Sequence, residues 1–167
     1  IAAPTVPPLD PGFRPAILAN RSFLAAVEAS GRGTLLRLGL ERPDGAISTF
    51  ETTVFSDDSP QSGDNLAYVE RLVKFLLWQK GGSRILVAGA PDVAEALAGL
   101  YCEGGRQQFD WEFIGGKIFG ENIRVQSVPV EELPEESTAA IELGRHLDGC
   151  RIGFDLGGSD RKCAAVI

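Results

Sequence analysis

The sequence contains no methionine, a single histidine and no pair of cysteines in a C-x-x-C arrangement. Its three cysteines, Cys102, Cys150 and Cys163, and its histidine, His146, do not have the spacing of a structural zinc site. We therefore expect reduced, mostly buried thiols, as in proteins of the cytoplasm. Because the first residue is not methionine and the chain stops at Ile167 inside an apolar, strand-like run, we expect this sequence to be a segment of a longer protein.

The sequence also lacks a long apolar run, an N-terminal signal pattern and an excess of basic residues. No apolar stretch approaches the roughly 18 residues of a membrane span, and no basic region followed by an apolar stretch begins the chain. The 16 basic residues are outnumbered by 23 acidic ones, which gives a formal net charge of −7 over 167 residues. This charge disfavours binding to nucleic acid or to an anionic membrane, because both require positive charge on the protein.

Composition divides the chain into four parts. Residues 1–15 contain five of the ten prolines, which predicts an extended, Pro-rich arm. Residues 16–130 have the helix and strand patterns of a mixed α/β module, which we call the accessory module. Residues 131–150 begin with four glutamates around a proline and predict an acidic linker. Residues 151–167 have the pattern of a strand, a glycine-rich turn and a second strand.

Hydrophobic periodicity predicts the elements of the accessory module. Alternation of apolar and polar residues around an Asp-Gly turn predicts a β-hairpin, whereas apolar residues three and four apart predict helices. The predicted elements, in chain order, are a loosely helical stretch (16–29), a hairpin (34–55), a helix (64–80), a buried strand (84–88), a helix that begins at Pro91, an irregular segment (104–120) and a strand within 122–130. This succession belongs to the mixed α/β class.

Five aromatic residues of the module have two interpretations: Trp78, Phe109, Trp111, Phe113 and Phe119. The favoured one is that these rings fill the core of the module itself. The alternative is that they pack the module on a second protein body or on another subunit.

The C-terminal strand–turn–strand segment carries the residues with the clearest chemistry. Gly157 and Gly158 allow close approach of the backbone, and successive N–H groups in such a turn can form a concave anion site. Ser159 adds a hydroxyl donor and Lys162 a positive charge. Asp155 would repel phosphates unless Mg²⁺ or its bound water lies between them.

Other nucleotide-binding motifs are absent from the sequence. There is no G-x-x-x-x-G-K-[ST] loop and no G-x-G-x-x-G fingerprint, and Gly115-Gly116-Lys117 lacks the flanking residues of a Walker A loop. Because a tight structural turn also selects glycines, a hairpin that binds no nucleotide remains an alternative.

The segment Ile152-Gly-Phe-Asp-Leu-Gly-Gly-Ser-Asp-Arg-Lys162 resembles the first phosphate motif of the actin-like ATPase superfamily. Its form is most similar to that of bacterial sugar kinases of the ROK family (repressor, open reading frame, kinase). The segment Leu72-Val-Lys-Phe-Leu-Leu-Trp-Gln-Lys-Gly-Gly82 is similar to an N-terminal extension in one branch of ROK-like proteins. The resemblance implies that residues 151–167 begin a ribonuclease H-like ATPase lobe.

The resemblance also implies ATP and Mg²⁺ as cofactors. Asp155 would lie near the metal of Mg-ATP, Gly157, Gly158 and Ser159 would wrap the β- and γ-phosphates, and Lys162 would lie close by. The parent protein would be a cytoplasmic, ATP-dependent kinase of a hexose-type sugar. The sequence has serine at 159 where threonine is usual in the family, and the carboxylate that follows it adds a negative charge beside the turn.

In the family, the catalytic aspartate, the sugar-binding carboxylates, a cysteine-rich zinc motif and the second phosphate loop all lie further along the chain. Residues 1–167 alone are therefore not expected to transfer phosphate. The alternative is a non-catalytic regulatory or oligomerisation module of a ROK-like protein. In that case the protein could form a homo-oligomer. DNA binding, as in ROK repressors, is disfavoured because the preceding region is acidic and has no helix-turn-helix pattern.

Overall fold

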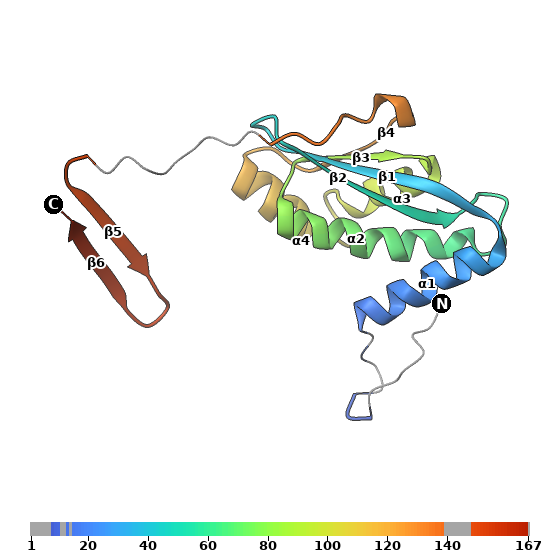
Figure 1. Ribbon diagram of the computed structural model, residues 1–167, viewed down its shortest axis with the longest axis horizontal. Coiled ribbons are helices and arrows are strands. Elements are labelled where there is room, and N and C mark those ends of the chain that lie inside the picture. Colours follow the sequence, from blue (N-terminus) through green and yellow to red (C-terminus); the bar gives the residue numbers. More distant parts are fainter. Residues whose placement is uncertain (1–7, 11–12, 14, 139–147, 167) are drawn as a thin grey trace.

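The computed structural model describes residues 8–10, 13, 15–138 and 148–166, and their fold belongs to the predicted mixed α/β class (Figure 1). The elements in chain order are α1 (Ala16–Ser30), β1 (Gly33–Glu41), β2 (Ile47–Phe55), a 3₁₀ turn (Ser62–Asp64), α2 (Asn65–Lys80), β3 (Arg84–Ala88), α3 (Pro91–Leu100), α4 (Gln108–Asp110), a π-helix (Trp111–Phe119), β4 (Arg124–Ser127), a 3₁₀ turn (Val130–Glu132), β5 (Arg151–Leu156) and β6 (Arg161–Val166).

Strands β1 to β4 form one sheet in the order β2-β1-β3-β4. β1 is antiparallel to both β2 and β3, whereas β3 and β4 are parallel. The parallel pair requires a crossover, which α3, α4 and the π-helix provide. The predicted hairpin over 34–55 is confirmed as β1 and β2.

Local hydrogen bonds explain where the β1–β2 hairpin turns. The backbone N–H groups of Arg42 and Gly45 donate to the carbonyl oxygens of Ala46 and Arg42, and the Asp44 carboxylate accepts from the Ala46 N–H at 3.1 Å. The Arg42 guanidinium pairs with Asp44, and this hydrogen bond lowers the pKa of the carboxyl group. The Asp-Gly turn therefore fixes the register in which Leu38 lies opposite Phe50.

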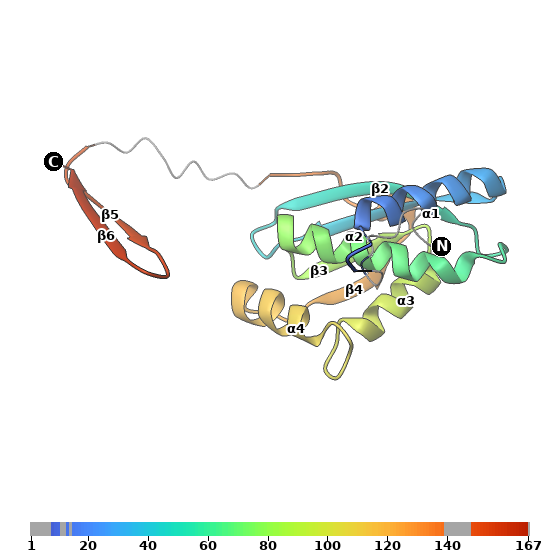
Figure 2. The same cartoon turned by 90° about the horizontal axis from the view of Figure 1, so that it is seen from below.

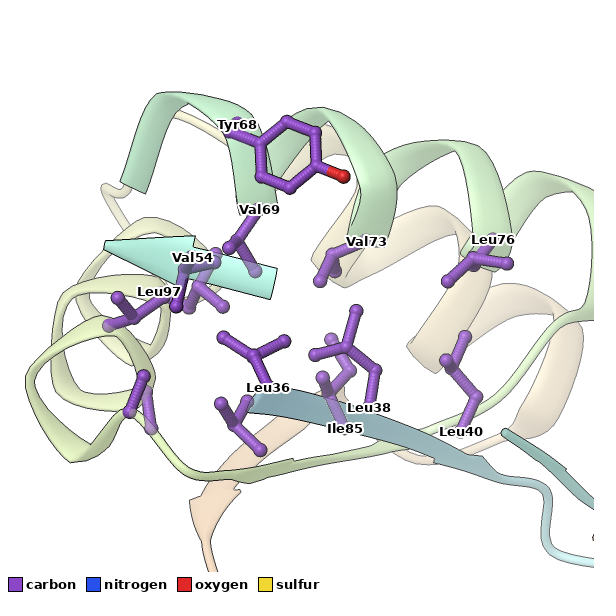
Figure 3. Packing of buried hydrophobic residues seen from close by; sticks show 14 of the residues in the cluster. Leu36, Leu38, Leu40, Val54, Tyr68, Val69, Val73, Leu76, Ile85 and Leu97 are labelled. Atoms are coloured by element: carbon purple, nitrogen blue, oxygen red, sulfur yellow. The ribbon is translucent and has the colours of Figure 1, made fainter. Parts of the chain in front are cut away.

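Helices α1, α2 and α3 lie on one face of the sheet, and the view from below in Figure 2 looks onto them. β1 contributes Leu36, Leu38 and Leu40 to the core between the sheet and α2, where they are at most 1% exposed (Figure 3). The Asn65 side chain ties the start of α2 to the end of β2, because it donates to the Phe55 carbonyl and accepts from the Phe55 N–H. α2 therefore runs antiparallel to β2.

The opposite face of the sheet carries a smaller apolar cluster. Leu86 and Ala88 of β3 pack there with Leu133 and the partly buried Val128. Ser137 forms two backbone hydrogen bonds with Ile47 at the start of β2. The segment that follows β4, including the first part of the predicted acidic linker, thus lies against the sheet.

The segment after α3 is more regular than predicted. An irregular chain was expected over 104–120, but residues 108–119 form α4 and a nine-residue π-helix. The expectation failed because a π-helix has neither the 3.6-residue nor the two-residue period that sequence patterns reveal. The strand expected within 122–130 is confirmed, in shorter form, as β4.

Candidate functional site

The residues singled out by the sequence lie together at one end of a two-stranded antiparallel sheet, β5–β6. Asp155 is paired with Lys162 across the two strands, and Leu156 is paired with Arg161. The turn between the strands is therefore residues 157–160, which contains both glycines and Ser159 (Figure 1). The strand–turn–strand pattern predicted for this segment is confirmed.

The two glycines of the turn have different surroundings. A Cβ atom at Gly157 would lie 3.0 Å from the Asp160 carboxylate and 3.1 Å from its carbonyl oxygen, whereas a Cβ at Gly158 would meet nothing within 4 Å. Neither glycine has a positive φ angle. A side chain at Gly157 would thus press on Asp160 inside the turn, whereas Gly158 leaves the space beside the turn open to a ligand.

Charged groups of both signs surround the turn. The Lys162 Nζ lies 3.8 Å from the Asp155 carboxylate and 3.3 Å from the Asp160 carboxylate. All three side chains are more than half exposed, so these ion pairs contribute little to stability. Replacement of one of these carboxylates by a phosphate group as the partner of Lys162 therefore requires little free energy.

The two faces of the hairpin differ in polarity. Ile152, Phe154 and Leu156 alternate along β5 and share one face, where they are 63%, 72% and 76% exposed. Asp155 and Lys162 lie on the other face. Every described residue of β5 and β6 is exposed, so nothing among the described residues covers the apolar face.

A metal ion would have few protein ligands at this turn. Across the parts of the chain that the structure describes, no group of three or more His, Cys, Asp or Glu side chains could hold a metal ion. A single carboxylate fits Mg²⁺ that arrives with nucleotide phosphates, because Mg²⁺ is usually bound through one or two carboxylates together with substrate phosphates. Asp155 therefore suits Mg-ATP but not a resident metal site.

A second polar cluster, in the module, was not found from the sequence. The buried Asp110 carboxylate accepts from Lys74 Nζ at 2.7 Å and from Trp78 Nε1 at 3.1 Å. The Glu70 carboxylate accepts from Gln107 at 2.6 Å and pairs with Arg106. These contacts join α2 to the segment after α3 and leave both carboxylates paired, so the cluster is structural.

Of the five aromatic residues, two belong to the core of the module and three form an exposed surface. Trp111 and Phe119 are partly buried and pack against the main core, as favoured. Trp78, Phe109 and Phe113 are 52%, 66% and 39% exposed, and their rings lie within 19° of parallel with centroids 5.5–6.5 Å apart. These three side chains form an exposed aromatic surface rather than core.

The expectation of buried thiols is wrong for two of the three cysteines. Cys150 and Cys163 are exposed and Cys102 is intermediate, and all three are free. Their apolar neighbours in sequence suggested burial, but the β5–β6 hairpin that contains Cys163 is itself exposed. His146 lies outside the described residues.

Comparison with known proteins gives no relative for this chain: no protein-family model, no curated protein and no solved structure matches it. In the described part of the chain, no helix is both long and apolar enough to cross a membrane.

Proposed function

We propose that this chain supplies the first phosphate-binding loop of a cytoplasmic, ATP-dependent sugar kinase of ROK type, together with an accessory α/β module. The observation that carries the proposal is the placement of Asp155 at the end of β5, beside an open glycine turn and opposite Lys162. An acidic group for Mg²⁺, backbone donors for phosphate and a nearby cation are what binding of Mg-ATP requires.

In the proposed site, the N–H groups of the 157–160 turn and the Ser159 hydroxyl donate to phosphate oxygens. Lys162 neutralises part of the phosphate charge, and Asp155 would hold the Mg²⁺ of the nucleotide. When bound, Mg²⁺ would supply positive charge that offsets the negative charge on the phosphates during transfer.

The uncovered apolar face of β5 supports the same proposal. An isolated two-stranded hairpin is at best marginally stable in water, and three large apolar side chains on one face favour packing against a further layer. The proposal places that layer, with the sugar-binding residues, the catalytic base and the second phosphate loop, after Ile167.

Replacement of Asp155 tests the proposal in the natural gene product that contains this chain. D155N preserves the side-chain shape and removes the charge that faces the metal, so sugar-dependent ATP consumption should fall on the order of a hundredfold. The matched control is D160N, which removes the other turn carboxylate and should retain activity. Equal activity of D155N and wild type, or no ATP consumption with any hexose or hexosamine, would contradict the proposal.

A second candidate, a non-catalytic oligomerisation module, is favoured by the exposed aromatic surface of Trp78, Phe109 and Phe113. Aromatic side chains are enriched in the centres of interfaces. The double variant F109S/F113S, with both positions exposed, should convert an oligomer to monomer in light scattering. A monomeric wild type, or an unchanged mass of the folded variant, argues against this candidate.

A further inference from the structure

An apolar groove of the module lies between the start of α1 and the second half of α2, beside β2. Its volume is about 530 Å³, which lies within the range of small-molecule sites. The apolar side chains that line it come from three elements: Ile17, Phe50, Leu72, Phe75 and Leu76. Ile17 and Phe75 are 58% and 62% exposed, so the groove is open to solvent along its rim.

A cationic side chain lies among these apolar residues without a carboxylate partner. Arg71 Nε and Nη2 both donate to the Asn20 Oδ1, each at 3.2 Å. Among the described residues no carboxylate forms an ion pair with Arg71, whose hydrogen bonds go to Asn20, although the chain as a whole has an excess of acidic groups. The half-buried guanidinium thus keeps its positive charge and its remaining N–H donors for a ligand.

The two ends of the groove differ in charge. The Arg71–Asn20 bond joins α2 to α1 at one end, and Lys80 lies nine residues further along α2, about 13.5 Å away. Glu136 lies at the Lys80 end, because its neighbour Ser137 pairs with the start of β2, and β2 runs antiparallel to α2. At the other end the charges of Lys80 and Glu136 have opposite signs, so an anionic group is attracted more strongly to the Arg71 end.

We propose that this groove binds a medium-chain aliphatic carboxylate. The carboxylate accepts hydrogen bonds from the Arg71 guanidinium, whose planar donors match two oxygens, and from the Asn20 amide. The alkyl chain lies along Leu72, Phe75 and Leu76 toward Lys80. Burial of each CH₂ group against these side chains favours binding. The proposal does not depend on nucleotide binding at the β5–β6 hairpin.

The test compares octanoate with octanol on the purified 167-residue chain by isothermal titration calorimetry. The two probes share an alkyl chain and differ in charge, so octanoate should bind about tenfold or more tightly than octanol. R71Q should reduce octanoate affinity by about the same factor and leave octanol affinity unchanged. R21Q, at an exposed position of α1, removes the same charge and should have no effect.

Two further variants separate the groove from general charge and folding effects. K80Q should reduce octanoate affinity less than R71Q does. I17E places a carboxylate on the exposed groove rim without removing the Arg71–Asn20 bond, and should abolish binding of octanoate. Absence of octanoate binding to wild type, equal affinities of the two probes, equal losses in R21Q and R71Q, or octanoate binding retained in I17E would each overturn the proposal.

Discussion

At the scale of single residues, the two tyrosines differ in what their hydroxyl groups contact. Both are 2% exposed. The Tyr68 hydroxyl lies 2.7 Å from the Thr52 hydroxyl, whereas the Tyr101 hydroxyl is buried without a hydrogen-bond partner among the described residues. Burial, and then the nearby Asp110 and Glu70 carboxylates, raises the pKa of Tyr101 above its ordinary value. The Tyr101 hydroxyl is therefore a buried polar group that contributes no hydrogen bond to the fold.

Removal of the Tyr101 hydroxyl should not destabilise the protein. Y101F is expected to leave the free energy of unfolding unchanged or to raise it by up to about 1 kcal/mol, because no hydrogen bond is lost and an unpaired polar group is removed from the core. Y68F, the matched control, should lower it by about 1 kcal/mol. Urea denaturation at neutral pH measures both, and a loss in Y101F as large as in Y68F would contradict the expectation.

Tyr101 should also make stability depend on alkaline pH. In the unfolded chain a tyrosine loses its proton near pH 10, but folded Tyr101 retains it because its pKa is raised. The unfolded state therefore binds fewer protons, and stability falls as pH increases above about 10. Denaturation measured between pH 9 and 11 should show a smaller decrease for Y101F than for wild type.

At the scale of elements, the sequence predicts those whose period is regular. Apolar residues recur at helical spacing in α2 and at two-residue spacing in β1 and β2, and each of these elements matches its predicted range within a few residues. The π-helix escapes prediction because its backbone bonds, such as that from the Gly120 N–H to the Gly115 carbonyl, span five residues. No common residue pattern marks such a segment.

Within the π-helix, Gly115 and Gly116 should respond differently to the same substitution. A Cβ at Gly115 would lie 2.6 Å from the Ile123 nitrogen and 2.7 Å from the Glu121 carbonyl oxygen, whereas at Gly116 the nearest atom is the Asn122 side-chain oxygen at 3.2 Å. G115A forces backbone apart and should lower the free energy of unfolding by about 1–3 kcal/mol. G116A should change it by less than about 0.5 kcal/mol. Thermal and urea denaturation of both variants measure the difference, and equal effects would show that the close backbone approach is not rigid.

At the scale of the whole molecule, contacts between segments that are distant in sequence determine the features that local sequence patterns do not predict. The site residues Asp155 to Lys162 were found because they are consecutive in sequence. Ile17, Phe50 and Arg71 line one groove although they belong to three elements, and no local pattern brings them together. The exposure of the Phe109 and Phe154 side chains could not be predicted for the same reason. A sequence shows which residues are apolar, but long-range contacts determine which of them are buried.

The distribution of buried surface predicts a large difference in local stability between the two sheets. Val87 and Leu38 are fully buried in the four-stranded sheet, whereas every described residue of β5 and β6 is exposed. In hydrogen exchange on the 167-residue chain, amides of β1 and β3 should exchange at least about a thousandfold more slowly than those of the hairpin, since core strands open only with global unfolding. The hairpin amides should become protected when the natural gene product is measured, because the proposed kinase lobe then covers Ile152 and Phe154. Strong protection of the hairpin in the 167-residue chain itself would show that its apolar face is already packed on this module or on a second copy, and the covering layer would then not be a kinase lobe.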